Sequence, residues 1–227
     1  TYNSDNVSMM PAIINTITMV LLALLFSVPF GIGAAIYLVE YAKKGNKLVE
    51  LVRITAETLT GIPSIIYGLF GMLFFVTALK WGYSMMAGAA TLAIMVLPVI
   101  MRTTEEALLC VPDSFREGSF GLGAGKLRTI FKIVLPSAIP GILSGIILAI
   151  GRIVGETAAL IYTSGTVATL AGFFDSGRTL AIHMYSLSRE GMHTNEAYAT
   201  AVVLLIVVLI INGVSSLIAK KFEAPKQ

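Results

Sequence analysis

Five long stretches without a charged residue constrain this chain more than any other feature of its sequence. They lie between Asp5 and Glu40, Glu57 and Lys80, Lys80 and Arg102, Lys132 and Arg152, and Glu196 and Lys220. A helix needs about 20 apolar residues to cross roughly 30 Å of membrane hydrocarbon, so each stretch can hold one crossing helix. We therefore expect an all-α polytopic transmembrane bundle. It would be a single domain over residues 1–227, with spans at about 13–39, 60–79, 83–101, 134–160 and 198–219.

The composition agrees with a membrane protein. Hydrophobic residues make up 56% of the chain and charged residues 13%, against roughly 25% charged in soluble domains. These values exclude a disordered chain, a disulfide scaffold and an ordinary cytosolic enzyme. Cys110 is the single cysteine and cannot form an intrachain disulfide. His183 and His193 have no cysteine or carboxylate at ligand spacing, so the sequence supports no metal site.

The basic residues indicate the orientation. Five alternating crossings place segments 40–57, 102–132 and 220–227 on one side, and these segments hold twelve of the sixteen Lys and Arg residues. The other side has Lys80, Arg178 and Arg189, while Arg152 lies within the membrane zone. By the positive-inside rule, the N-terminus of this chain is outside and its C-terminus is cytoplasmic. The excess of basic residues behind the net charge of +3 is thus explained by membrane topology and does not indicate nucleic-acid binding.

The cytoplasmic loop 102–132 predicts two short helices. Residues 104–109 can continue the preceding membrane helix until Pro112 ends that run. Ser114 and Glu117 then form a capping box for a second helix, which a cluster of glycines would stop after about two turns. So short a helix is unstable alone in water. The segment is therefore either a shaped loop or a docking element for a soluble subunit.

The same segment resembles the EAA loop of ATP-binding-cassette importer permeases, E-A-A-x3-G-x9-I-x-L-P. Glu117 is followed by Gly118 and Ser119 in place of the two alanines, then by Gly123, and, after nine intervening residues, by Ile133-Val134-Leu135-Pro136. In that family the loop forms a coupling helix that sits in a groove of the ATPase subunit. The resemblance implies that ATPase coupling falls to Ser114, Glu117, Gly118, Ser119, Gly123, Leu135 and Pro136.

The string GLGAGKL in this loop is not a phosphate-binding loop. That motif requires glycine at 120 and Ser or Thr at 127, where this chain has Phe120 and Leu127. We expect no ATP hydrolysis and no cofactor in this chain. ATP and magnesium would be used by the partner ATPase.

A pair of charges interrupts the fourth predicted span. Arg152 and Glu156 stand at i and i+4, so on a continuous helix they share a face and can pair. Arginine in hydrocarbon costs about 2.5–3.5 kcal/mol, which suggests a cavity or subunit-facing role. A guanidinium also binds tetrahedral oxyanions. Alternatively, Arg152 snorkels outward and Glu156 only neutralises it. Gly141 with Gly145, and Gly151 with Gly155, would allow close helix packing.

The string GRIVGETAALIYTSG is similar to the signature of phosphate-importer permeases of the PstA type, approximately R-A-x-G-E-T-A-P-L-L, with Ala159 replacing its usual proline. The similarity extends over about residues 11–219. It implies a type I importer permease of the inner membrane that moves phosphate by alternating access. Its partners would be a second permease subunit, an ATPase dimer and an extracytoplasmic phosphate-binding protein. The family usually has six spans, one of them ahead of the equivalent of residue 11, which suggests that this sequence is N-terminally incomplete. The substrate-pathway residues it implies are Arg102, Arg152, Glu156 and Thr157.

Alternatives remain at this stage. The same machine could carry another oxyanion or small solute, or the chain could be a non-transporting membrane sensor. A secondary transporter would show repeated halves, which the sequence lacks. Arg102 could snorkel instead of guiding anion exit. In the outer loop 166–197, the segment LAIHMYSL predicts either an interfacial helix that touches a solute-binding protein or a helix that caps the bundle.

Overall fold

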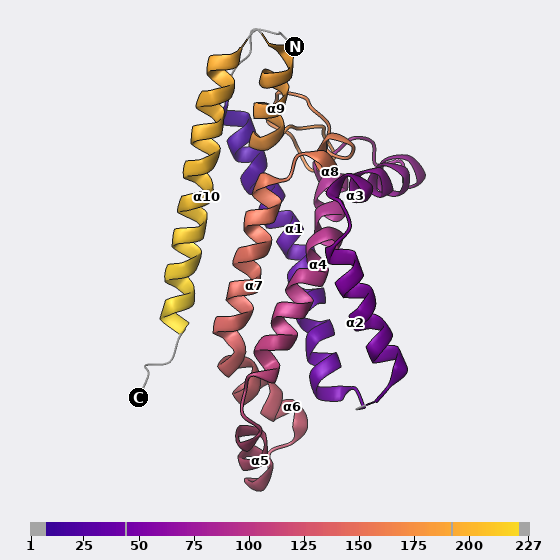
Figure 1. The fold of residues 1–227 in the computed structure, drawn as a ribbon, viewed down its shortest axis with the longest axis vertical. Helices are drawn as coiled ribbons and strands as arrows, with labels where there is room; N and C mark the ends of the chain where they lie inside the picture. The colour runs from indigo at the N-terminus through magenta and orange to yellow at the C-terminus, as the bar shows by residue number, and fades with distance from the viewer. Residues whose placement is uncertain (1–7, 44, 192, 223–227) are drawn as a thin grey trace. The chain divides into compact units, whose positions relative to one another are not determined.

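The computed structural model describes residues 8–43, 45–191 and 193–222. Within these ranges the chain is helical with irregular connections and no β-strand, which confirms the all-α prediction (Figure 1). Labels with η denote π-helical segments. In chain order, the elements are α1 (Met10–Ile36), η1 (Tyr37–Tyr41), α2 (Lys47–Thr60), α3 (Ser64–Gly71), η2 (Met72–Ala78), α4 (Met85–Leu109), α5 (Asp113–Gly121), α6 (Lys126–Thr129), η3 (Ile130–Val134), α7 (Leu135–Gly155), α8 (Ala158–Ile161), α9 (Leu180–Glu190) and α10 (Thr194–Phe222).

The described part of the chain contains four to five candidate membrane spans. Four helical stretches are long and apolar enough to cross alone: Met10–Tyr41, Met85–Leu109, Lys126–Gly155 and Thr194–Leu217. The fifth candidate is a broken pair, Lys47–Thr60 followed by Ser64–Ala78. At 1.5 Å per residue, the second member of the pair is roughly 22 Å long, which is too short to cross alone.

The fourth span differs from the predicted 134–160. Its helix begins at Lys126, continues through η3 into α7, and ends at Gly155. Charged residues are acceptable in its first turns because they can lie outside the hydrocarbon. At the other end, Glu156 and Thr157 interrupt the helix before the four-residue α8.

The helices fall into two compact units. Unit 1 comprises residues 1–27, 61–96 and 150–211, and unit 2 comprises residues 28–60, 97–149 and 212–227. The chain passes from one unit to the other within α1, α4, α7 and α10. The single transmembrane domain over residues 1–227 stays a prediction.

Unit 1 is held by close helix contacts and by one buried amide. A Cβ added at Gly68 of α3 would lie 2.8 Å from the Cα of Ala159 in α8, so α3 and α8 pack against each other with no room for a side chain (Figure 1). The Asn15 side chain is buried in α1. Its Nδ2 donates to the carbonyl oxygens of Thr169 at 2.9 Å and Arg178 at 3.2 Å. Asn15 thereby fixes the predicted outer loop to the membrane helix.

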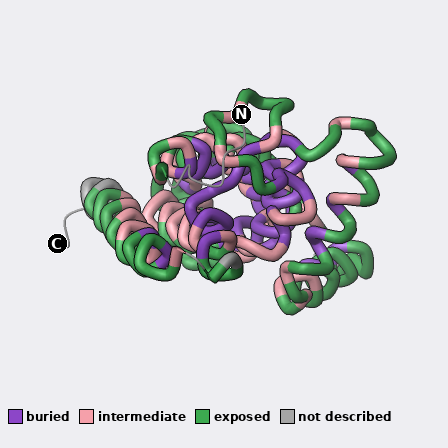
Figure 2. The backbone as a smooth tube through the Cα atoms, turned by 90° about the horizontal axis from the view of Figure 1, so that it is seen from above, coloured by how far each residue is buried: buried purple, intermediate pink, exposed green. Residues whose placement is uncertain are grey.

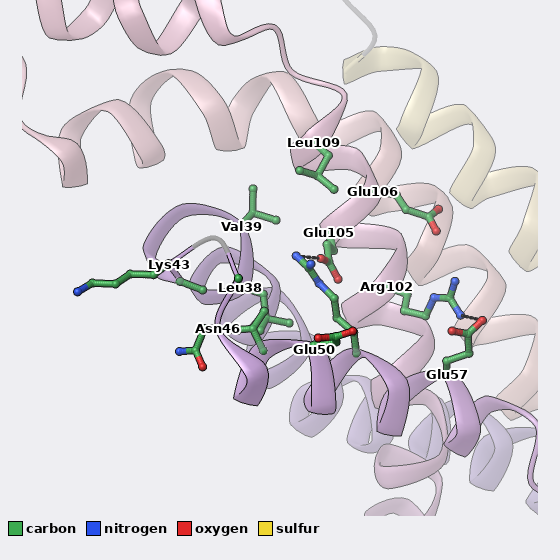
Figure 3. Close-up of a pocket in the computed structure, with 14 residues that line it drawn as sticks. Leu38, Val39, Lys43, Asn46, Glu50, Glu57, Arg102, Glu105, Glu106 and Leu109 are labelled. Carbon is green, nitrogen blue, oxygen red and sulfur yellow. Dashed lines mark ion pairs between the residues drawn. The ribbon is translucent and has the colours of Figure 1, made fainter.

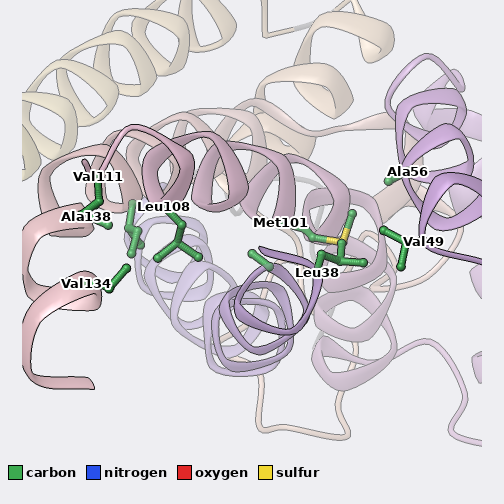
Figure 4. Close-up of a cluster of buried hydrophobic side chains, with 10 residues drawn as sticks. Leu38, Val49, Ala56, Met101, Leu108, Val111, Val134 and Ala138 are labelled. Carbon is green, nitrogen blue, oxygen red and sulfur yellow. The ribbon is translucent and has the colours of Figure 1, made fainter. Parts of the chain in front are cut away.

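Unit 2 is built around a cluster of buried apolar side chains (Figure 4). Gly141 of α7 faces Ala107 of α4, where an added Cβ would approach the Ala107 Cβ to 2.6 Å. Gly145 contacts Thr103 in the same interface. The first small-residue pair therefore serves the predicted helix packing. At Gly151 and Gly155 an added Cβ would meet nothing within 4 Å in the described structure. The cluster consists of Ala35, Leu38, Val49, Ala56, Met101, Leu108, Val111, Val134, Ala138 and Ile142.

The last helix is the least buried candidate span. Figure 2 shows α10, the helix nearest the label C, as exposed or half-buried along most of its length, and 11% of its apolar window is buried. An apolar helix of this kind suits contact with lipid or with another membrane subunit.

Candidate functional site

The predicted coupling helix exists as α5, but it begins differently from the prediction. Its first residue is Asp113, with Pro112 as N-cap and no side-chain capping bond. The capping box expected from Ser114 and Glu117 is therefore wrong. Because the helix starts two residues early, Ser114 lies inside its first turn and not at the flanking position where a hydroxyl reaches the open N–H groups. Glu117 is exposed on α5.

The end of α5 explains the glycine of the family pattern. The Ala124 N–H donates to the Ser119 carbonyl at 3.1 Å, and the Gly123 N–H donates to the Phe120 carbonyl at 2.9 Å. These two bonds form a Schellman motif, which requires a left-handed residue after the helix. Gly123 takes that role, with φ +80°. It acts as the predicted stop signal for the helix.

Arg116 anchors α5 within unit 2. Its Nε and Nη2 donate to Oε1 of Glu40 in η1, at 3.0 and 2.9 Å. Its Nη1 also donates to the Val111 carbonyl at 2.8 Å, and its Nη2 to the Leu108 carbonyl at 2.9 Å. The side chains of Arg116 and Glu40 are only 14% and 9% exposed. One guanidinium thus satisfies carbonyls at the end of α4 and joins α5 to η1.

A second contact ties α5 to α6. The Ser119 and Thr129 hydroxyls lie 2.8 Å apart and are both buried. Ser119 replaces the family's alanine and adds a hydrogen bond there. Gly118 is exposed. Leu135 is half-buried and Pro136 exposed in the first turn of α7, which follows α6 and η3.

The remaining surface of this segment is apolar and exposed. Leu122, immediately after α5, is 91% exposed. Large exposed apolar side chains close together are unusual on a water-facing surface and indicate an interaction site. The exposed set on α5, α6 and their connection, called here the α5 surface, comprises Phe115, Phe120, Leu122 and Leu127.

Predicted pathway residue Arg102 lies in unit 2, in a groove of about 720 Å³ (Figure 3). Its Nη1 is 3.3 Å from Oε1 of Glu57 in α2. A stronger pair joins Arg53 of α2 to Glu105 of α4, with Nη2 and Oε1 2.6 Å apart and Glu105 10% exposed. Both partners of the Arg102 pair are well exposed, so this contact contributes about 0–1 kcal/mol and can open easily.

The intramembrane charges do not form the predicted pair. No ion pair joins Arg152 to Glu156 within the described residues. Because α7 ends at Gly155, Glu156 leaves the helical path and loses i,i+4 geometry. Its buried Oε1 accepts a hydrogen bond from the Ala159 N–H at 3.0 Å, which caps α8. Arg152 is half-buried and interacts electrostatically with Tyr67 of α3. Glu156 thus holds the backbone at the start of α8.

Thr157 follows directly and borders two cavities in unit 1. The larger, of about 720 Å³, lies between α3, α8 and α9 and is named here the α9 cavity. It is lined by Ile65, Thr157, Ala158, Ile161, Tyr162, Thr166, Tyr185, Ser186 and Arg189. The smaller, of about 380 Å³, is shared by α9 and α10. Thr157 makes no side-chain capping bond to α8 and lines both cavities.

Several residues at these sites could not be predicted from the sequence. Arg116 and Glu40 are 76 residues apart in the sequence, and the pair of Arg53 with Glu105 also joins distant parts of the chain. No local spacing identifies such pairs. Arg189 appeared in the sequence only as one of three basic residues in outer segments. On α9, the polar residues Tyr185, Ser186 and Arg189 lie beside the apolar residues of the helix. This pattern could have predicted that one face of α9 is not buried.

Known proteins that resemble this chain are membrane permeases of transport systems. The family described as binding-protein-dependent transport system inner membrane component matches residues 27–224. YqgI, a probable ABC transporter permease protein of Bacillus subtilis, is 36% identical over 92% of this chain and 78% of its own length. The phosphate transport system permease protein PstA 1 of Mycobacterium tuberculosis is 36% identical over 91% of this chain and 69% of its own. PstA of Yersinia pestis is 37% identical over 89% and 69%.

Solved structures show the same fold. An inward-facing MetNI methionine ABC transporter has a chain that matches with a TM-score of 0.75 at 20% identity, over 94% of each chain. A bacterial ABC transporter for the acidic polysaccharide alginate matches with 0.73 at 18% identity, over 95% of this chain and 80% of the other. These likenesses confirm the predicted type I importer permease fold.

Proposed function

This chain belongs to the binding-protein-dependent transport system inner membrane component family, and we propose that it is the permease subunit of an ATP-driven importer for inorganic phosphate. The observation that carries the substrate is its identity of more than a third, over most of its length, to permeases named for phosphate transport. The multi-pass permease would work by alternating access in the inner membrane.

The α5 surface is the proposed docking site for the ATPase. It carries exposed apolar side chains on the same short segment as the exposed Glu117, while Arg116 holds the helix to α4 and η1. Burying Phe115, Leu122 and their neighbours in a partner groove would be favourable, at about 25 cal/mol per Å² of apolar area. ATP and magnesium would bind in a pair of ATPase subunits, and this chain would bind no cofactor and catalyse no reaction itself.

The orientation follows from that assignment. With the α5 surface in the cytoplasm, the chain's N-terminus lies outside and its C-terminus inside, as the basic residues favour. An extracytoplasmic phosphate-binding protein would then deliver the anion on the side of α9. A second permease subunit would complete the enclosure, and the exposed apolar α10 suits such a neighbour or lipid.

The anion path would use Thr157, Arg152 and Arg102 in turn. Arg152 keeps a positive charge near Tyr67, which suits transient contact with a phosphate. Glu156 would act by holding the break between α7 and α8, where its carboxylate meets the Ala159 N–H. At the cytoplasmic side, the weak Arg102–Glu57 pair would open to let the anion pass.

Substrate choice is tested by uptake into right-side-out vesicles that contain the permease with its encoded partners. Radiolabelled phosphate should accumulate when ATP is supplied inside, and a tenfold excess of unlabelled sulfate or molybdate should leave that uptake unchanged. Vesicles with an ATPase variant that cannot hydrolyse ATP provide the background. Uptake of sulfate or molybdate in preference to phosphate would contradict the proposed substrate, but the chain would still be an importer permease.

A further inference from the structure

The open face of α9 forms one wall of the α9 cavity. Along this helix the apolar side chains of Leu180, Ile182 and Leu187 are buried, whereas Tyr185 and Arg189 are exposed. The exposed residues line the cavity together with Ser186. The helix ends cleanly just beyond Arg189 because Gly191 is left-handed, with φ +69°. The position of the Arg189 backbone beside the cavity is therefore fixed.

The cavity has the chemistry of an anion site. Arg189 is the single charged residue among the described residues that line it, and no carboxylate is present in that set. The other polar groups are the hydroxyls of Thr157, Tyr162, Thr166, Tyr185 and Ser186. A guanidinium offers five N–H donors, and each hydroxyl can donate one more hydrogen bond. The oxygens of a tetrahedral oxyanion accept hydrogen bonds, so each of these groups is a suitable ligand for one.

The opposite wall strengthens the electrostatic contact. Ile65, Ala158 and Ile161 supply apolar surface around the polar groups. An apolar wall lowers the local dielectric and so strengthens the attraction between a guanidinium and an anion. By contrast, the groove near Arg102 is lined by both acidic and basic residues and does not favour one sign of charge.

We propose that the α9 cavity is a weak binding station for a phosphate-type oxyanion, with Arg189 as its charged ligand and the Thr157 and Tyr185 hydroxyls as further donors. The inference rests on the proposed function, because it places the station at the outer part of the proposed path. One cation without a second charged partner gives modest affinity. A station of this kind can accept an anion and release it toward Arg152, whereas a tight site would retain it.

Binding of inorganic phosphate to the whole purified transporter, without its binding protein, tests the proposal. Equilibrium dialysis with radiolabelled phosphate in detergent should detect one site per copy of this chain. Arg189→Gln should weaken that site about tenfold or more, as expected when a hydrogen bond to a charged group is lost. Arg189→Lys should retain part of the affinity. Lys80→Gln, which removes a positive charge from an exposed position outside the cavity, should bind like the wild type.

A lipid headgroup shares the phosphate chemistry and is distinguished by repeating the titration in nanodiscs. Discs of phosphatidylcholine alone should give the affinity found in detergent, and added phosphatidic acid should not displace the phosphate. Occupancy by phosphatidic acid without binding of free phosphate would overturn the proposal. Equal phosphate affinity in the wild type and Arg189→Gln would also overturn it.

Uptake measured in parallel separates this proposal from the proposed function. If the wild type accumulates phosphate and Arg189→Gln matches it in both binding and uptake, the α9 cavity proposal alone fails. If the wild-type complex accumulates no phosphate, the importer assignment fails whatever the cavity binds. Size-exclusion profiles and ATPase content of each variant should equal those of the wild type, because Arg189 is exposed.

Discussion

Arg116 in α5 donates two hydrogen bonds to Oε1 of Glu40 in η1, and the Nη2–Oε1 distance is 2.9 Å. The same guanidinium donates to the Leu108 and Val111 carbonyls at the end of α4. A helix of nine residues is too short to be stable alone. These contacts therefore hold α5 against the end of α4 and against η1, which continues α1. A displacement of α5 by a partner would be transmitted to both of these long helical stretches.

Replacing Arg116 by Gln should loosen α5 without unfolding the chain. The lost charge-assisted bonds to Glu40 and the carbonyls are worth about 1–3 kcal/mol, so amide exchange in α5 should accelerate by about ten- to a hundredfold. ATP hydrolysis should persist while phosphate transport per ATP falls. Arg128→Gln on exposed α6 is the matched control. Unchanged exchange in Arg116→Gln would contradict the anchoring role.

Replacing Gly123 by Ala should fray the end of α5. A residue with a Cβ at φ +80° is strained by roughly 1–2 kcal/mol, and the Schellman bonds weaken with it. Gly121→Ala is a close control, since it lies two residues earlier inside α5 with open space around it and should stabilise the helix slightly. The amount of ATPase that co-purifies with each variant provides the measurement. Equal loss in both variants would show that any added methyl group disturbs docking.

Reversing the charge of Glu117 should reduce ATPase coupling. Glu117 is exposed on α5 beside the apolar residues of the α5 surface, so Glu117→Lys changes the docking face and leaves the fold intact. Glu196→Lys, at an exposed position in the first turn of α10, tests the effect of charge reversal elsewhere. ATP hydrolysis and phosphate uptake in the same vesicles should both fall only for Glu117→Lys. If Glu117→Lys hydrolyses ATP and takes up phosphate at wild-type rates, the ATPase does not dock at Glu117.

Glu156 should tolerate Gln better than Ala. A Gln side-chain oxygen can still accept from the Ala159 N–H and keep α8 capped, whereas Ala leaves that buried donor unpaired at a cost of about 1–3 kcal/mol. We expect Glu156→Gln to keep wild-type thermal stability and Glu156→Ala to lower it. A thermal shift assay on the purified complex measures the difference. If both variants melt alike, the cap contributes nothing.

The sequence predicted the parts of this structure that depend on local pattern. Apolar stretches indicated the membrane helices, Pro112 separated α4 from α5, and Gly123 marked the end of α5. The pairing of Arg152 with Glu156 failed because a continuous helix was assumed, and nothing local showed that α7 ends at Gly155. The Arg116–Glu40 contact arises from tertiary packing and has no sequence signature.

Phosphate accumulation by the reconstituted complex with Arg152→Ala tests the central claim most directly. The whole complex, with ATPase and binding protein, is placed in proteoliposomes, and radiolabelled phosphate uptake is followed beside ATP hydrolysis. The account predicts that the wild type concentrates phosphate, while Arg152→Ala assembles fully but transports at background level. Undiminished accumulation by an assembled Arg152→Ala complex would contradict the placement of the anion path at this charge.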